Sequence, residues 1–248
     1  MKHFFRCFFS SIKNFENRFW LPKDGNLTET LDDLSKRKPG ISILQLGAND
    51  GVNNDPYFDL IKKYNWHGIL VEPQPNVFKR LLANYENRNH HLNFANYAVS
   101  DKKGVKTMFY LDVPNQTWAD GLTSFSKSNI LAHIDNGYIE QQLSESGFHF
   151  NKEEQLKLIK EIQIECKTVE DIMKDNGLQQ VDIIAMDLEG YDHVIVNNLN
   201  LNRLTPEIVV YESKYVDFEL YKRAVKHLRK YNYTVYKDGQ DIFAIRNG

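Results

Sequence analysis

The chain of 248 residues is 42% hydrophobic and 26% charged, which is enough to build one sizeable core without a second domain. Its 31 basic residues are balanced by 33 acidic ones, so there is no basic excess for nucleic acid and we expect no nucleic-acid partner. Cys7 and Cys166 are too few for a disulfide framework or a zinc site. They favour a reducing compartment, and we therefore expect a cytoplasmic location.

The first 21 residues interleave aromatic with basic side chains. Apolar residues recur at helical spacing, at Phe4, Phe8, Ile12, Phe15 and Phe19. This pattern predicts a helix with an apolar and a basic face, interrupted by charge too often for a signal peptide. With a short helix predicted at 28–36, it forms an N-terminal helical extension over residues 1–38. Three arrangements stay open: packing against the rest of the chain, packing in a dimer, and peripheral contact with the inner face of a membrane.

Apolar runs alternate with helical patterns from residue 39 to residue 248, which predicts one α/β domain with a mostly parallel sheet. Strands are expected at 41–46, 68–72, 92–99, 105–111, 181–186, 207–211, 233–236 and 242–245. Asp238-Gly239 lies between the last two and is a hairpin signal, so these two strands should be antiparallel.

Residues 114–160 interrupt this alternation with a stretch rich in Ser, Asn, Gln and His. Weak helical patterns occur in it around 129–143 and 152–162. Long inserts at the ligand end of an α/β sheet are commonly lids or acceptor-binding loops, and we expect that role here rather than a spacer. Candidates for contact with an acceptor are Trp118, His133, Tyr138 and His149.

The first predicted strand leads directly into the turn Gly47-Ala48-Asn49-Asp50-Gly51, and a helix is predicted soon after it. A strand, a glycine turn and a helix in this order bring backbone close to a nucleotide-like ligand in α/β proteins. The next strand ends in Glu72, which is placed to accept hydrogen bonds from ribose hydroxyls. We therefore expect an adenosine cofactor.

The details of the turn favour one cofactor over another. A dinucleotide site would prefer G-x-G-x-x-G, whereas this turn is G-x-x-x-G with Asn49 and Asp50 inside it. Amide and acidic side chains suit a ligand that carries an ammonium group and no phosphate, such as S-adenosylmethionine. The turn would meet its amino-acid part, and residues 96–99 its adenine. An NAD-dependent oxidoreductase remains the alternative.

Four motifs in sequence order carry a family resemblance. They are LQLGANDG at 44–51, VEPQP at 71–75, NYAVSD at 96–101 with Gly104, and DLEGYD at 187–192. Together they resemble the FkbM-family methyltransferases over about residues 40–246. The resemblance implies a Rossmann-like class I methyltransferase fold, a mostly parallel seven-stranded sheet with a C-terminal antiparallel hairpin. It also implies O-methylation of hydroxyls on sugars, glycans or polyketide-like products.

The same resemblance implies S-adenosylmethionine as the cofactor and assigns the residues that bind it. The methionine part would be held by Gly47, Asn49, Asp50 and Gly51, the ribose by Glu72, and the adenine by Ala98, with Asp187 beneath the methyl donor. The usual family ending Glu-Gly-x-Glu is here Glu189-Gly190-Tyr191-Asp192. The change keeps the charge and shortens the reach of the last side chain.

A sugar hydroxyl is a poor nucleophile and benefits from a base that removes its proton. Asp187 follows strand 181–186, where open sheets place ligands, and Glu189 and His193 come soon after it. We prefer them as the base in the order Asp187, Glu189, His193. Each residue also has another possible role. Asp187 could bind only the ammonium group of the cofactor, Glu189 could cap the following helix, and His193 could be an ordinary residue on the helix surface.

We favour a metal-free site. The alternative is a hard divalent cation that acidifies the hydroxyl, held by Asp187, Glu189, Asp192 and Glu212. The sequence therefore predicts an O-methyltransferase for a small-molecule or glycan acceptor. A non-catalytic, membrane-recruited scaffold with a degenerate cofactor pocket is the remaining alternative, and the intact Gly47, Gly51, Glu72 and Asp187 argue against it.

Overall fold

The computed structural model describes residues 22–86, 91–114, 116–213 and 218–248. The predicted aromatic and basic helix within 1–21 lies outside these residues. In the described ranges no helix is both long and apolar enough to span a bilayer.

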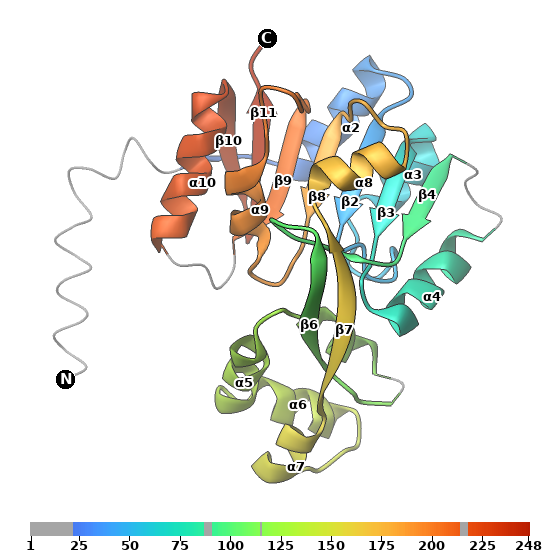
Figure 1. The fold of residues 1–248 in the computed structure, drawn as a ribbon, viewed down its shortest axis with the longest axis vertical. Coiled ribbons are helices and arrows are strands. Elements are labelled where there is room, and N and C mark those ends of the chain that lie inside the picture. Colours follow the sequence, from blue (N-terminus) through green and yellow to red (C-terminus); the bar gives the residue numbers. More distant parts are fainter. Residues whose placement is uncertain (1–21, 87–90, 115, 214–217) are drawn as a thin grey trace, which may run out of the picture.

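Eight strands form the main sheet, in the order β1-β10-β11-β9-β8-β2-β3-β4 (Figure 1). Their bounds are β1 Lys23–Asp24, β2 Ser42–Leu46, β3 His67–Val71, β4 Leu92–Ala95, β8 Ile183–Met186, β9 Ile208–Glu212, β10 Tyr233–Asp238 and β11 Asp241–Arg246. The strands from β9 to β4 are parallel to their neighbours, whereas β11 is antiparallel to both β9 and β10. The predicted α/β sheet and its closing hairpin are thus confirmed.

The sheet differs from the expected seven strands at its edge. Lys23 and Asp24, which lie in the expected N-terminal extension, pair with Tyr236 and Lys237 and add the short parallel strand β1. A two-residue strand has no periodicity of its own, and its partner lies at the other end of the chain. Its presence gives the sheet an eighth strand, and the antiparallel β11 makes the sheet mixed.

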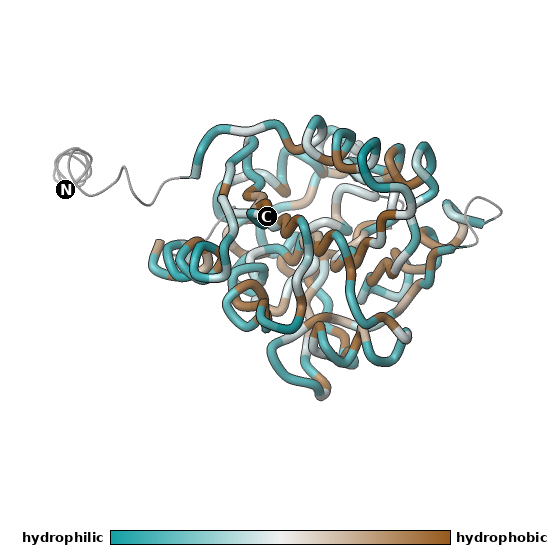
Figure 2. Tube along the Cα trace, turned by 90° about the horizontal axis from the view of Figure 1, so that it is seen from above, coloured by the Kyte–Doolittle hydropathy of each residue, from teal (hydrophilic) through white to brown (hydrophobic). Residues whose placement is uncertain are grey.

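Helices cover both faces of the sheet, which explains why every residue of β2 is buried. One face packs against α8 Val169–Asp175, α9 Asp192–Asn198 and α10 Phe218–Lys230, and the other against α2 Leu27–Arg37, α3 Phe58–Tyr64 and α4 Pro75–Tyr85. Successive side chains of β2 alternate between the two cores, Leu44 in the first and Ile43 in the second. The apolar strands therefore lie inside the molecule (Figure 2).

Helix α2 was expected in the N-terminal extension. Its Leu27, Leu31 and Leu34 pack in the same core as Ile43. Residues 27–37 therefore belong to the packed α/β unit, and the boundary expected at residue 38 falls inside it.

A second, three-stranded sheet has the order β5-β7-β6, with β5 Ala98–Val99, β6 Gly104–Leu111 and β7 Ile159–Lys167. The long β6–β7 pair extends away from the main sheet (Figure 1). At its far end it carries residues 112–158, which we call the insert. The insert contains η3 Thr117–Leu122, α5 Lys127–Asp135, α6 Tyr138–Glu145 and α7 Lys152–Lys157.

The insert has a small hydrophobic core of its own, which includes Leu122, Ile130, Ile139 and Leu143. It is therefore a folded unit on a two-stranded stalk rather than a spacer. The helical pattern expected at 152–162 ends at Lys157, because β7 begins at Ile159. The strand expected at 92–99 is also interrupted. The Asn96 side chain donates to the backbone oxygens of Glu72 and Pro73, and the chain turns there from β4 into β5.

Candidate functional site

The carboxyl ends of the parallel strands bring most of the predicted site residues to one edge of the main sheet. Gly47 follows β2, Glu72 follows β3 and Asp187 follows β8. These three strands are neighbours in the sheet, so their ends adjoin. This is the edge at which open α/β sheets bind ligands.

Backbone contacts fix the glycine turn, which follows β2, between the ends of β3 and β8. Gly47 has a φ of +77°, and a Cβ added there would overlap the carbonyl oxygen of Asp187. Its N–H donates to the Val71 oxygen at 2.9 Å. Asn49 also has a positive φ, of +49°, and its N–H donates to Glu72 Oε2 at 3.0 Å. Only glycine permits so close an approach at position 47.

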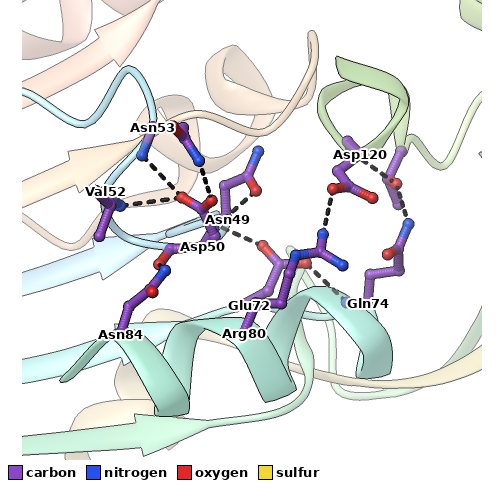
Figure 3. Close-up of polar contacts among 10 residues, drawn as sticks. Asn49, Asp50, Val52, Asn53, Glu72, Gln74, Arg80, Asn84 and Asp120 are labelled. Carbon is purple, nitrogen blue, oxygen red and sulfur yellow. Dashed lines mark hydrogen bonds and ion pairs between the residues drawn. The ribbon is translucent and has the colours of Figure 1, made fainter. Parts of the chain in front are cut away.

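Asp50 and Gly51, both expected to hold the methionine part, have structural contacts. The buried Asp50 carboxylate accepts hydrogen bonds from the N–H groups of Val52 and Asn53, which shape the turn (Figure 3). A Cβ on Gly51 would lie 2.6 Å from side-chain atoms of Leu81 and Tyr85 on α4. Gly51 therefore allows the turn to pack on α4, and it lines neither of the two cavities described below.

Glu72 is 6% exposed, and each of its carboxylate oxygens accepts one backbone N–H. Oε2 accepts from Asn49, and Oε1 accepts from Gln74 at 2.8 Å (Figure 3). Burial raises the pKa of Glu72 to about 7, despite these two hydrogen bonds. A carboxylate oxygen can accept a second hydrogen bond, so the group can still receive two hydroxyls. Glu72 thus fits the ribose of an adenosine cofactor.

Two cavities open at this edge of the sheet. The narrow cavity, about 70 Å³, has Glu72 and Asn49 on its polar side and an apolar wall of Val71, Ala98, Val99, Met108 and Phe125. The wide cavity, about 690 Å³, lies between the strand ends and the insert. Both are lined by Gly47, Asn49, Gly121, Asp187 and Glu189. The polar and apolar walls of the narrow cavity suit a ribose and an adenine, and the wide cavity is large enough for a second molecule.

The insert closes over the narrow cavity through two contacts, one with the residue before α4 and one with the middle of that helix. Arg80 forms an ion pair with Asp120 of η3, and Gln74 Nε2 donates to Thr123 Oγ1 at 3.0 Å (Figure 3). A volume of 70 Å³ corresponds to roughly two water molecules, far less than a nucleoside. We therefore expect the insert to shift outward when the cofactor binds.

The three candidate bases have different positions. Asp187 is exposed. Glu189 has a positive φ of +49°, and its backbone oxygen accepts a hydrogen bond from Asn129 Nδ2 at 2.9 Å. Both line the two cavities. His193 is fully buried on α9, with its ring 5.1 Å from that of Tyr211, and lines neither cavity. Burial lowers the pKa of His193 to about 4. The structure therefore does not bring His193 to the site, and its position does not fit the role of the base.

The divalent-cation alternative lacks a site in the described part of the chain, where no three His, Cys, Asp or Glu side chains are grouped to hold a metal ion. Asp192, one of its four expected ligands, is fully buried, and its carboxylate accepts the N–H of Leu188 at 3.2 Å. Burial, and then the charge of Asp187, raise the pKa of Asp192 to about 8. Asp192 therefore stabilises the loop after β8.

The wide cavity also includes residues that the sequence did not single out. Asp241 begins β11 opposite Glu212 at the end of β9, so both lie at the ligand edge. The hairpin signal could have placed Asp241 there, because an antiparallel last strand begins where its parallel neighbour ends. From the insert, Trp118, His133 and Tyr138 line the cavity as expected, whereas His149 is exposed and lines neither cavity.

A protein-family model matches most of the chain. The model of the methyltransferase FkbM domain matches residues 45–235. No curated protein sequence matches the chain. Among solved structures, the methyltransferase FkbM from Methylobacillus flagellatus KT is 11% identical, with 84% of this chain and 44% of that chain covered and a TM-score of 0.49. The chain therefore spans less than half the length of that protein.

Two further solved structures are similar at lower scores. Fibrillarin from Aeropyrum pernix, with natively bound S-adenosyl-L-methionine, is 14% identical, with 84% of this chain and 67% of that chain covered and a TM-score of 0.40. An RNA methyltransferase from Salinibacter ruber, in complex with S-adenosyl-L-homocysteine, is 10% identical, with 92% and 95% covered and a TM-score of 0.38. The family match, rather than these distant structures, favours a methyltransferase over an oxidoreductase. Because that match covers most of the chain, from residue 45 to residue 235, the chain belongs to the methyltransferase FkbM domain family.

Proposed function

We propose that the protein transfers a methyl group from S-adenosylmethionine to a hydroxyl of a sugar, a glycan or a glycosylated natural product. The observation that carries the proposal is the meeting of the two cavities at Asp187 and Glu189. A cofactor in the narrow cavity and an acceptor in the wide one would have their reacting atoms at that junction. Alignment of two reactants can lower the free-energy barrier of such a displacement by roughly 7–11 kcal/mol.

The residues of the narrow cavity would hold the cofactor in a defined direction. Glu72 would accept hydrogen bonds from the ribose, and the apolar wall beside Ala98 would contact the adenine. Gly47 and Asn49, which line both cavities, would contact the methionine part. When bound, S-adenosylmethionine would supply an electrophilic methyl group on a positively charged sulfur.

At the junction, a carboxylate of the chain would act on the acceptor. Asp187 would accept the proton of the acceptor hydroxyl as its oxygen attacks, and Glu189 is the second candidate. Gly121 of the insert, which also lines both cavities, would help to exclude water from the junction.

The walls of the wide cavity support a polyhydroxylated acceptor. Trp118 and Tyr138 of the insert make an edge-to-face pair with ring centroids 6.5 Å apart. Asn54, Asn136 and Gln142 supply amide groups in the same cavity. Aromatic rings contact the C–H faces of a sugar, and amides exchange hydrogen bonds with its hydroxyls.

The test is methyl transfer from S-adenosylmethionine with a deuterated methyl group to a panel of oligosaccharides, followed by mass spectrometry. We expect one labelled methyl group on a sugar oxygen, and no label with the Glu72→Ala variant. Label on nitrogen or on a carboxylate, or binding of NAD without binding of S-adenosylhomocysteine, would overturn the proposal. Tight binding of S-adenosylhomocysteine without transfer to any acceptor would favour the non-catalytic scaffold.

A further inference from the structure

The loop that carries Asp187 and Glu189 has an unusual backbone conformation. Glu189 has a φ of +49° and Gly190 a φ of +91°, so two successive residues lie in the left-handed region. A residue with a Cβ rarely keeps this conformation unless its surroundings fix it. The contacts around residues 187–191, which we call the β8 loop, therefore decide where both carboxylates lie.

The insert supplies such a contact from the first turn of α5. Asn129 Nδ2 donates to the backbone oxygen of Glu189 at 2.9 Å and to Ser124 Oγ at 3.1 Å. These two bonds account for both hydrogens of the amide and fix its orientation. A Cβ on Gly190 would lie 3.5 Å from the same nitrogen, so the Asn129 side chain packs directly against the β8 loop.

Ser124 joins this contact to the rest of the insert. It is buried, and its backbone exchanges two hydrogen bonds with Phe109 of β6, at 2.8 and 2.9 Å. Its Oγ also donates to the Glu189 oxygen, at 3.4 Å. The β8 loop is therefore attached both to α5 and, through Ser124, to the strand that carries the insert.

The helix that holds the loop also forms part of the wall of the wide cavity. His133 follows Asn129 by one turn and so lies on the same side of α5. His133 and Asn136 line the wide cavity, as does Tyr138, whose ring is 5.3 Å from that of His133. An acceptor on this wall would therefore contact the same helix that binds the Glu189 oxygen.

We propose that Asn129 is a positioning residue, through which the insert holds the β8 loop and so controls the position of Asp187 and Glu189 at the junction. The inference rests on the proposed function and names a control of that site. Asn129 lines neither cavity, so it acts on the reactants through the loop. Without this contact the two carboxylates would lose their fixed position, and methyl transfer would slow although both ligands could still bind.

Hydrogen–deuterium exchange of the β8 loop tests the contact without an acceptor. The amides to follow are those of Leu188, which donates to Asp192, and Tyr191, which donates to the Leu188 oxygen. In the full chain, with and without S-adenosylhomocysteine, Asn129→Ala should raise their exchange rates roughly tenfold. Asn129→Asp keeps the size of the side chain but cannot donate when ionised, and should have the same effect. Unchanged exchange in both variants would overturn the inference.

Asn176→Ala is the matched control. Asn176 is half-buried like Asn129, and its Nδ2 also donates to a backbone oxygen and a hydroxyl, those of Ile172 at 2.8 Å and Tyr97 at 3.4 Å. It lines neither cavity, and its replacement should leave exchange in the β8 loop unchanged. Equally fast loop exchange in this control would show a general loosening of the fold and would overturn the specific role of Asn129.

Turnover separates positioning from a purely structural role. With the oligosaccharide that the wild type methylates, Asn129→Ala should lower kcat roughly tenfold, because alignment at the junction is lost. The acceptor KM and the affinity for S-adenosylhomocysteine should change by less than about threefold, because the binding walls remain. In the slower of the Asp187→Asn and Glu189→Gln backgrounds, the same substitution should cost at most about twofold, because the group that Asn129 positions is gone. A tenfold loss in both backgrounds would overturn the inference.

The two measurements distinguish this inference from the proposed function. Faster loop exchange in the Asn129 variants, with no methyl transfer to any oligosaccharide by the wild type, would support the hold on the loop and overturn the proposed function. Methyl transfer to a sugar, with kcat and loop exchange unchanged in the Asn129 variants, would support the proposed function and overturn the inference.

Discussion

The backbone of Gly47 lies against the carbonyl oxygen of Asp187, so closely that a Cβ on residue 47 would overlap that oxygen. The N–H of Asp187 in turn donates to the Leu46 oxygen at 3.0 Å. The ends of β2 and β8 are thereby held together at the junction of the two cavities. The cofactor site and the candidate base are fixed by the same contact.

Replacing Gly47 with alanine should therefore damage both folding and cofactor binding. The new Cβ must displace the backbone of Asp187, and the alanine must also adopt a positive φ. We expect these effects to lower the free energy of unfolding by about 1–3 kcal/mol. Gly177→Ala is the control, because Gly177 has a similar φ of +68° and open space around it. We expect binding of S-adenosylhomocysteine, measured by calorimetry, to be lost only in the Gly47 variant. Equal effects of the two substitutions would show that the close approach is unimportant.

Asp187→Asn should lower turnover about 100-fold or more while the affinity for S-adenosylhomocysteine stays within about tenfold, because the amide keeps the shape and cannot accept the proton. Glu189→Gln should have a smaller effect on turnover. His193→Met is the control, since the buried ring contacts no cavity, and its turnover should be unchanged. A normal rate for the Asp187 variant, with a large loss for Glu189→Gln, would transfer the role of base to Glu189.

The ion pair between Arg80 and Asp120 should govern how long the cofactor stays bound. Arg80→Ala removes one of the two contacts that close the insert over the narrow cavity, so release of S-adenosylhomocysteine should accelerate roughly three- to tenfold. Lys79→Ala changes the exposed neighbour on α4 and should leave the release rate unchanged in stopped-flow measurements. An unaltered rate in the Arg80 variant would contradict a closing role for the insert.

The buried carboxyl of Asp192 should make stability depend on pH. Its pKa is about 8 in the folded protein, against 3.8 for an ordinary aspartate, so the folded chain holds an extra proton between these values. Because the unfolded chain binds fewer protons there, the free energy of unfolding falls as the pH rises toward 8 and is lowest above it. Asp192→Asn stays uncharged and should exceed the wild type by roughly 1–3 kcal/mol at pH 9. Urea unfolding at pH 7 and pH 9 tests this, and an equal pH dependence of the two proteins would refute it.

The local features of the site could be predicted from the sequence. Gly47, Glu72 and Asp187 each follow directly after an apolar strand, and the ends of neighbouring parallel strands meet at one edge of a sheet. Strand position and residue type were therefore sufficient to place them. The closing hairpin was equally local, because Gly239 and Gln240, directly after Asp238, form its turn.

Long-range contacts could not be predicted in this way. The pairing of Arg80 with Asp120, and of β1 with β10, joins segments whose own patterns do not indicate a partner. His193 was misplaced for a different reason: it lies three residues before the buried Val196, so helical spacing puts it on the core face of α9. Strand β7 was missed although Ile162, Ile164 and Cys166 alternate with polar residues, which is a strand pattern.

A crystal structure with S-adenosylhomocysteine tests the central claim most directly. The account predicts its adenine beside Ala98, its ribose hydroxyls within hydrogen-bonding distance of Glu72, and its sulfur at the junction next to Asp187, with the insert moved outward. Density for S-adenosylhomocysteine in the wide cavity alone would contradict the claim. So would a bound ligand that contacts neither Glu72 nor Ala98.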